Sequence, residues 1–197
     1  KITDDNSINF ILLYLNILLK IFLTNFLKKM KINNISIVIP ILNEEKNLIQ
    51  LTNEIKKIKK KLKIKNFELI FVDDNSTDNS KIIFKNLSKK NKFLSFYIRK
   101  EKNRDLSKSC IIGFEKSNYK NILVMDGDLQ HPSKFIEHLT KKYFYKKLDI
   151  AIGSRNLLKK NSGLSLFRYI SSVIIIFVIS FFLGKKTTDP LSGFFIF

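Results

Sequence analysis

Short apolar runs alternate with helical patterns along most of this chain, and this alternation constrains the fold more than any other feature. The runs are rich in β-branched and aromatic residues and read ISIVIPIL, FELIFVDD, FLSFYIR, NILVMDGD and LDIAIGSR. Stretches of helical length separate them, and strands that alternate with helices are typical of a mostly parallel sheet. We therefore expect an α/β fold in which helices flank the sheet.

Two helices can be placed from their patterns. After Glu44, apolar residues recur at spacings of three and four while lysines fall between them; these residues are Leu48, Leu51, Ile55, Ile58 and Leu62. A second helix should begin at Pro132, whose missing N–H costs nothing in the first turn. We expect Phe135, Ile136 and Leu139 to form its buried face.

Residues 1–30 are expected to form a separate apolar segment. Within it, residues 8–27 form an apolar run close to the length that spans a bilayer, but Lys20 and three asparagines interrupt it. The sequence leaves open whether this run forms a membrane helix or an amphipathic surface helix. If it inserts, the lysines that follow place the next domain on the cytoplasmic side. We predict a membrane-associated protein in which the domain that follows this segment faces the cytoplasm.

Residues 31–197 have the length and apolar content of one folded domain. The chain stops inside the apolar run LSGFFIF, so we expect this domain to be truncated at its C-terminus, and Met30 reads like a natural start. A second apolar stretch, residues 169–184, has too short an uninterrupted core to span a bilayer. It suits a buried helix or an interfacial helix near the C-terminus.

The chain carries a formal net charge of +19, with 36 basic and 17 acidic residues. Such a charge is compatible with an anionic membrane, nucleic acid or a phosphorylated substrate, or with a lysine bias spread along the whole chain. Cys110 is the single cysteine, which excludes an internal disulfide and a thiol cluster for zinc. Any metal would have to be held by oxygen ligands.

Polar residues collect where the predicted strands end, in PILNEE, VDDNSTDNS, MDGDLQH and GSRN. Ligands bind at the carboxyl ends of parallel strands, where the loops converge. Residues i and i+2 of an extended segment point to the same side, so Asp126 and Asp128 can face one cation, and Gly127 allows close backbone approach. Carboxylate oxygens of this kind suit Mg²⁺ or Mn²⁺.

Five motifs together resemble family 2 glycosyltransferases of the GT-A (Rossmann-like) fold. They are ISIVIPILNEEKNL, FELIFVDDNSTDNS, VMDGDLQHPSKF, AIGSRN and TDPLSGFFIF, and the resemblance runs from about Ile35 to Phe197. The motifs DLQHP and DPLSGFF are most similar to those of the dolichol- or polyprenyl-phosphate mannosyltransferases.

This resemblance implies roles for individual residues. The nucleotide-sugar contacts would be Pro40, Leu42, Glu44, Val72, Asp74, Asp126, Gly127 and Asp128. The metal would be held by Asp126, Asp128 and Gln130. The acceptor phosphate would be held by Arg155, Arg168 and Ser172, with Asp128 and Arg155 as catalytic residues.

The implied reaction moves a hexose, mannose from GDP-mannose, onto a dolichyl or polyprenyl phosphate with inversion and with Mg²⁺ or Mn²⁺. A lipid phosphate is already ionised, so no strong general base is required and His131 receives no role. Two departures from the family pattern stand out: Leu42 replaces a frequent aromatic residue, and RKEKNRDLSKSCIIGF lacks glycines common there.

Two alternatives remain open at this stage. One is a transferase that uses a UDP-sugar, such as an undecaprenyl-phosphate glucosyltransferase. The other is a basic membrane- or nucleic-acid-binding module without activity, which would leave the clustered acids unexplained. We favour the enzyme, with a nucleotide sugar, a lipid phosphate and the membrane as partners and no nucleic acid.

Overall fold

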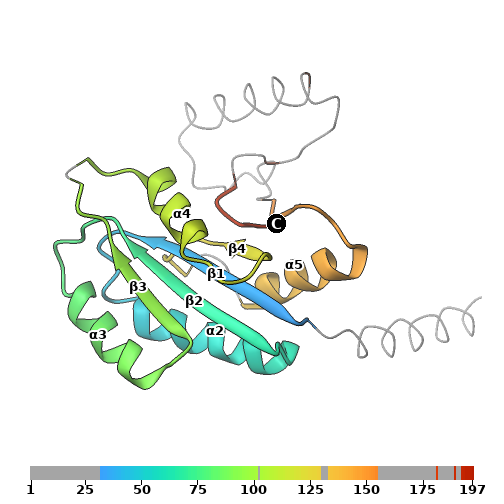
Figure 1. Ribbon diagram of the computed structural model, residues 1–197, viewed down its shortest axis with the longest axis horizontal. Coiled ribbons are helices and arrows are strands. Elements are labelled where there is room, and N and C mark those ends of the chain that lie inside the picture. Colours follow the sequence, from blue (N-terminus) through green and yellow to red (C-terminus); the bar gives the residue numbers. More distant parts are fainter. Residues whose placement is uncertain (1–31, 102, 130–132, 155–180, 182–188, 190–191) are drawn as a thin grey trace, which may run out of the picture. The chain divides into compact units, whose positions relative to one another are not determined.

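Six strands form one sheet in the order β3-β2-β1-β4-β6-β5 (Figure 1). This computed structural model describes residues 32–101, 103–129, 133–154, 181, 189 and 192–197. The strands are β1 (Asn34–Ile41), β2 (Asn66–Asp73), β3 (Leu94–Ile98), β4 (Ile122–Val124), β5 (Ala151–Ile152) and β6 (Phe195–Ile196). The helices are α2 (Leu48–Leu62), α3 (Ser80–Lys90), α4 (Leu106–Glu115) and α5 (Ser133–Lys146). The expected sheet flanked by helices is confirmed.

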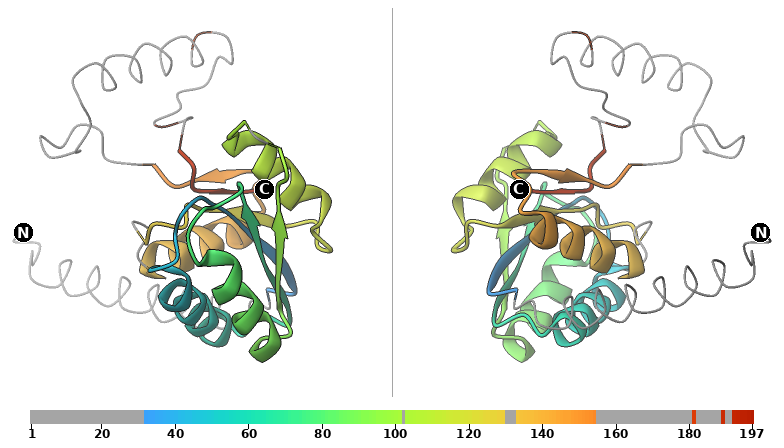
Figure 2. Two further views of the ribbon diagram at one scale, coloured as in Figure 1. Left: turned by 90° about the vertical axis from the view of Figure 1, so that its left-hand side faces the viewer. Right: turned by 90° about the vertical axis from the view of Figure 1, so that its right-hand side faces the viewer.

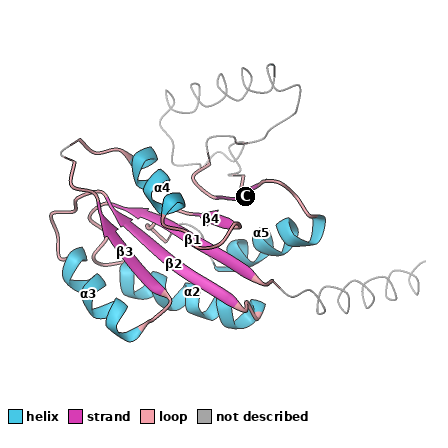
Figure 3. Ribbon diagram, viewed as in Figure 1, coloured by secondary structure: helices cyan, strands magenta, loops and turns pink. Residues whose placement is uncertain are grey.

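Helices cover both faces of the sheet, which is why its central strands are apolar on both sides. Strand β1 pairs in parallel with β2 and β4, and β2 pairs in parallel with β3. On one face Ile37 and Ile39 belong to a core shared with α2, α3 and α5. On the other face Val38 and Ile70 pack beneath α4 (Figures 2 and 3).

Strand β6 interrupts the parallel order. It lies between β4 and β5 and pairs antiparallel with both, so that Val124 and Ile152 are both partners of Phe195. The SGFF motif, which lies far along the chain, therefore inserts a strand between β4 and β5. The sequence did not predict this strand.

Helix α2 agrees with its pattern, because all five of its predicted apolar residues are buried. In α5, Ile136 and Leu139 are also buried, at 1% and 6% exposure. The prediction for Phe135 is wrong, since its side chain is 61% exposed. The buried stripe of α5 runs from Ile136 through Leu139 to Tyr143, and Phe135 lies one position outside it.

Within the residues that the structure describes, none of the helices is long and apolar enough to cross a bilayer. The apolar stretch at residues 8–27 lies outside the described residues. The second apolar stretch, residues 169–184, also lies outside them, apart from Phe181. Both membrane interpretations therefore stay predictions.

Candidate active site

The carboxyl ends of β1, β2 and β4 open into one cleft of about 370 Å³. Its walls are formed by Pro40, Ile41, Leu42, Glu44, Asp74, Arg104, Asp105, Leu106, Asp126, Gly127 and Asp128. Most of the residues assigned to the nucleotide sugar thus converge in space, although they come from three separate stretches of the chain. A wider hollow of about 600 Å³ lies between α2 and α5, but lysines dominate its lining and the strand ends do not reach it.

Asp126 and Asp128 are half-buried and lie on this one cleft, with Gly127 buried between them. A Cβ atom on Gly127 would lie 2.9 Å from Cγ2 of Ile41, so only glycine lets the end of β4 approach the end of β1 this closely. Paired carboxylates in a partly desolvated cleft fit a divalent cation, whose charge would offset their repulsion. Gln130, the third predicted ligand, lies outside the described residues.

No group of three or more His, Cys, Asp and Glu residues arranged to hold a metal occurs in the described part of the chain. The Cys110 thiol interacts electrostatically with the Asp126 carboxylate. Burial raises the pKa of the Cys110 thiol to about 11, and the Asp126 carboxylate contributes in the same direction. The thiol is therefore protonated at neutral pH, and the carboxylates remain the candidate ligands.

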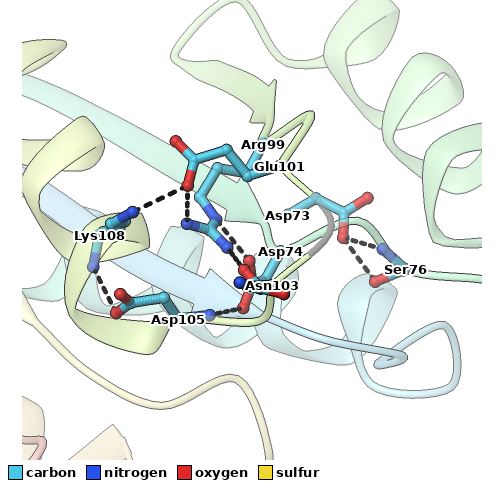
Figure 4. A network of polar contacts seen from close by, with 8 residues as sticks. All are labelled: Asp73, Asp74, Ser76, Arg99, Glu101, Asn103, Asp105 and Lys108. Atoms are coloured by element: carbon cyan, nitrogen blue, oxygen red, sulfur yellow. Dashed lines mark hydrogen bonds and ion pairs between the residues drawn. The ribbon is translucent and has the colours of Figure 1, made fainter.

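Asp74 ties three elements together at the edge of the cleft (Figure 4). Its Oδ1 accepts from Nε of Arg99 at 2.5 Å, and its Oδ2 accepts from the backbone N–H of Asp105 at 2.7 Å. Arg99 follows β3 and is 3% exposed, and its guanidinium also donates to Glu101 Oε2 and to the carbonyl oxygen of Asn103. This network, which is buried at Asp74 and Arg99, holds the described part of the loop that leads from β3 to α4.

That loop brings to the cleft three residues to which the sequence analysis gave no role: Arg104, Asp105 and Leu106. Asp105 caps α4, because its side chain accepts from the backbone N–H of Lys108 at 3.0 Å. The signal was an Asp just before a helical pattern, which predicts a helix start. The sequence could not show that this helix begins beside the acidic strand ends.

The loops after β1 and β2 are joined by backbone-to-side-chain hydrogen bonds. The N–H of Asn43 donates to Ser76 Oγ at 2.8 Å, and the N–H of Thr77 donates to Asn43 Oδ1 at 2.9 Å. The N–H of Glu45 donates to Asp78 Oδ2 at 3.0 Å. Burial alone would raise the pKa of Asp78, but hydrogen bonds from Ser80 and from the Glu45 N–H bring it below its ordinary value. The two loops thus form one rigid wall next to Glu44.

One predicted nucleotide contact does not line the cleft, and the predicted acceptor contacts lie outside the described residues. Val72 is fully buried in the core beneath α4 and is not among the cleft-lining residues. Arg155, Arg168 and Ser172 lie outside the described residues. Their predicted contacts with the acceptor phosphate, and the catalytic role of Arg155, stay predictions.

The chain matches the model of one known protein family over most of its length. The family model described as "Glycosyl transferase family 2" matches residues 36–197. The chain belongs to this family. Among curated relatives of the chain, the dolichol-phosphate mannosyltransferase of Pyrococcus furiosus is 35% identical over 82% of this chain and 45% of that protein. The undecaprenyl-phosphate 4-deoxy-4-formamido-L-arabinose transferase of Proteus mirabilis is 31% identical over 81% of this chain and 47% of that protein.

A solved structure supports the same fold. Glucosyl-3-phosphoglycerate synthase of Mycobacterium tuberculosis, in complex with Mn²⁺, UDP and glucosyl-3-phosphoglycerate, superposes with a TM-score of 0.58. It is 16% identical and covers 83% of this chain and 56% of that one, so the likeness concerns the fold. The expected GT-A fold is confirmed. The chain spans about half the length of the curated relatives it matches.

Proposed function

We propose that this family 2 glycosyltransferase moves a hexose from a nucleotide sugar to a polyprenyl phosphate. The observation that carries the proposal is the cleft of a family 2 chain in which Asp126 and Asp128, just after β4, line the same walls as Arg104 from the loop before α4. The names of the two curated relatives support the acceptor class, because dolichol phosphate and undecaprenyl phosphate are both polyprenyl phosphates.

Asp126 and Asp128, with Gln130, would hold Mg²⁺ or Mn²⁺. When bound, such a cation acts as a Lewis acid that stabilises the negative charge developing on the departing nucleoside diphosphate. The carboxylates are suited to orient it because the close packing of Gly127 on Ile41 holds them at the end of a rigid strand. The Mn²⁺ and UDP in the M. tuberculosis complex support a metal–diphosphate site in this fold.

Arg104 would hold the diphosphate from the opposite wall of the cleft. The other charged residues along this cleft are Glu44, Asp74, Asp105, Asp126 and Asp128, all acidic, so among the described lining residues Arg104 is the cation. Arginine offers paired donors to phosphate oxygens. Helix α4 begins at the same wall, and the positive end of its dipole also favours an anion. Binding in this position would orient the anomeric carbon of the sugar.

The acceptor phosphate would be held by Arg155, Arg168 and Ser172. Arg168 and Ser172 are four positions apart, so on a helix they would share one face. The phosphate is ionised at neutral pH and can attack the anomeric carbon directly, so no protein base has to remove a proton. A single in-line displacement of this kind inverts the configuration at that carbon.

For the donor we propose GDP-mannose, because the P. furiosus mannosyltransferase is 35% identical. The match to the P. mirabilis enzyme, named for a different sugar, keeps a UDP-sugar as the second candidate. Leu42 lines the cleft and offers an aliphatic surface to the base, which discriminates weakly between guanine and uracil. A non-catalytic basic module is disfavoured, because it gives no reason for a cleft lined by so many acids.

A donor screen tests this proposal. Radiolabelled GDP-mannose and UDP-glucose are each incubated with the protein, Mn²⁺ and vesicles that contain polyprenyl phosphate, and lipid-linked label is counted. Transfer of mannose supports the first candidate, and transfer of glucose alone supports the second. No lipid-linked product from either donor, with full-length protein, would contradict the proposal.

We further propose that the protein works at the cytoplasmic face of a membrane. The apolar residues 8–27 are followed by Lys28, Lys29 and Lys31, and lysines near an anionic surface contribute about 1 kcal/mol each. Sedimentation with anionic vesicles at low salt tests this placement. A protein that stays in the supernatant with both anionic and neutral vesicles would contradict it.

A further inference from the structure

The Asp126 carboxylate lies directly against the backbone of Gly193, in the SGFF motif. Strand β6 pairs antiparallel with β4, with Leu123 opposite Ile196 and Val124 opposite Phe195. Continuing this register toward the cleft brings Asp126 opposite Gly193. A Cβ atom on Gly193 would lie 2.9 Å from both Oδ1 and Oδ2 of Asp126 and 3.2 Å from its Cγ. Any side chain at position 193 would therefore collide with both carboxylate oxygens.

Space, and not backbone conformation, is the constraint at this position, because the φ of Gly193 is outside the left-handed region. The backbone around it is also held in place. Ser192 Oγ donates to the carbonyl oxygen of Gly153 at 2.7 Å, and the N–H of Gly153 donates to the carbonyl oxygen of Phe194 at 2.8 Å. The Phe194 ring lies tightly over Gly153, where a Cβ would be 2.2 Å from Cδ1. A methyl group at position 193 would have to displace the carboxylate.

We propose that Gly193 is a positioning residue for the catalytic metal: it leaves the room in which the Asp126 carboxylate takes the orientation needed to bind the cation. This inference rests on the metal site of the proposed function. Mutation of a residue that orients a metal ligand usually lowers metal affinity roughly 10- to 100-fold, although that residue does not touch the metal itself. It also gives a role to a motif that lies far from Asp126 in the sequence.

In the sequence, Gly193 follows the stretch that carries the proposed acceptor contacts. The stretch that carries Arg155, Arg168 and Ser172 begins directly after β5 and ends before β6, and these two strands pair with each other. The chain that would deliver the acceptor phosphate thus returns to the sheet beside the metal carboxylate. Gly193 lies at the point of return.

The variant Gly193→Ala tests the inference in the whole chain, residues 1–197. Mn²⁺ affinity is measured by electron paramagnetic resonance, and GDP and UDP affinity is measured by calorimetry in Mn²⁺ and in EDTA. We expect Mn²⁺ affinity to fall about tenfold or more, and nucleotide affinity in EDTA to stay at the wild-type value. Ser192→Ala is the matched control, because it removes two hydrogen bonds from the same turn, one to the Gly153 carbonyl oxygen and one from the Phe194 N–H, without adding an atom beside the carboxylate. It should lower the melting temperature and leave Mn²⁺ affinity within about threefold of wild type.

Unchanged Mn²⁺ affinity in Gly193→Ala would overturn the inference, and so would equal losses of Mn²⁺ affinity and of nucleotide affinity in EDTA. Wild-type protein that binds GDP and UDP no better in Mn²⁺ than in EDTA would instead contradict the proposed metal, and this result is visible without any variant.

A stability cycle tests the collision itself, even if Gly193→Ala folds poorly. The free energy of unfolding is measured without metal for Gly193→Ala, Asp126→Ala and the double variant. Because Asp126→Ala removes both oxygens that the methyl group would meet, the cost of the methyl group should largely disappear in that background. The same cost in both backgrounds would show that the methyl group meets something other than the carboxylate, and the inference would be wrong.

Discussion

The buried ion pair between Asp74 and Arg99 should control both the stability of the fold and the shape of the cleft at the strand ends. The two side chains are only 7% and 2% exposed, so solvent screens their interaction weakly. In Asp74→Asn the amide oxygen can keep one of the two hydrogen bonds from Arg99 and Asp105, and the other is lost. A charged hydrogen bond contributes about 1.5–3 kcal/mol. The buried charge of Arg99 adds to this cost, since removal of one partner of a buried pair typically costs about 3–5 kcal/mol.

We therefore expect Asp74→Asn to lower the free energy of unfolding by about 3–5 kcal/mol, measured by urea titration followed by circular dichroism. Glu101→Gln is the matched control, because Glu101 contacts the same guanidinium at 3.1 Å but its side chain is 57% exposed. Exposed pairs contribute about 0–1 kcal/mol. A loss below about 1 kcal/mol in Asp74→Asn, or equal losses in both variants, would refute the reasoning.

The ion pair also holds the loop that carries Arg104, so its loss should weaken nucleotide binding. Under conditions where Asp74→Asn is still folded, it should bind GDP and UDP more weakly than Glu101→Gln does. An apolar double variant, Asp74→Leu with Arg99→Met, should be more stable than Arg99→Met alone, because no unpaired charge remains buried. If the double variant is the less stable of the two, the desolvation argument fails.

Three further predictions concern the site and the acid limb of stability. Asp128→Ala should reduce turnover about 100-fold or more while leaving the melting temperature near wild type, with exposed Asp149→Ala as control and wild-type rates in excess chelator as the contrary result. Arg168→Ala should weaken acceptor use by roughly 10- to 150-fold with donor affinity almost unchanged; equal losses for donor and acceptor would show a structural role. Hydrogen bonds from Lys141 and Lys61 lower the pKa of Glu137, and hydrogen bonds bring that of Asp78 below its ordinary value despite burial. Both groups bind protons less readily when folded, so the stability they contribute is present above their ordinary pKa values of 4.5 and 3.8 and is lost as the pH falls below them. Asp78→Asn should flatten that acid limb in urea titrations at several pH values, and an unchanged slope would contradict the assignment.

Much of the fold followed from local pattern alone. The first four apolar runs overlap β1 to β4, because a strand buried on both faces is mostly apolar. Helix α2 followed from its spacing, and its buried residues agree. The convergence of Asp126 and Asp128 with Glu44 also followed, since the carboxyl ends of parallel strands meet at one edge. Phe135 shows the limit of such patterns, because a one-position error in the helical stripe turns a side chain to solvent.

The remaining features depend on contacts between residues far apart in the chain, which local pattern does not encode. The pairing of β6 with β4 is one of them, since so short a strand carries almost no periodic signal and its partner lies much earlier in the chain. The path of the chain between β3 and α4 is another. It decides that Arg99 pairs with Asp74 and that Arg104 lines the cleft. The sequence by itself determined which residue types collect at the strand ends and therefore the class of chemistry. Only the tertiary structure decided that Gly193 lies against Asp126, because the space around one carboxylate depends on every segment that packs there.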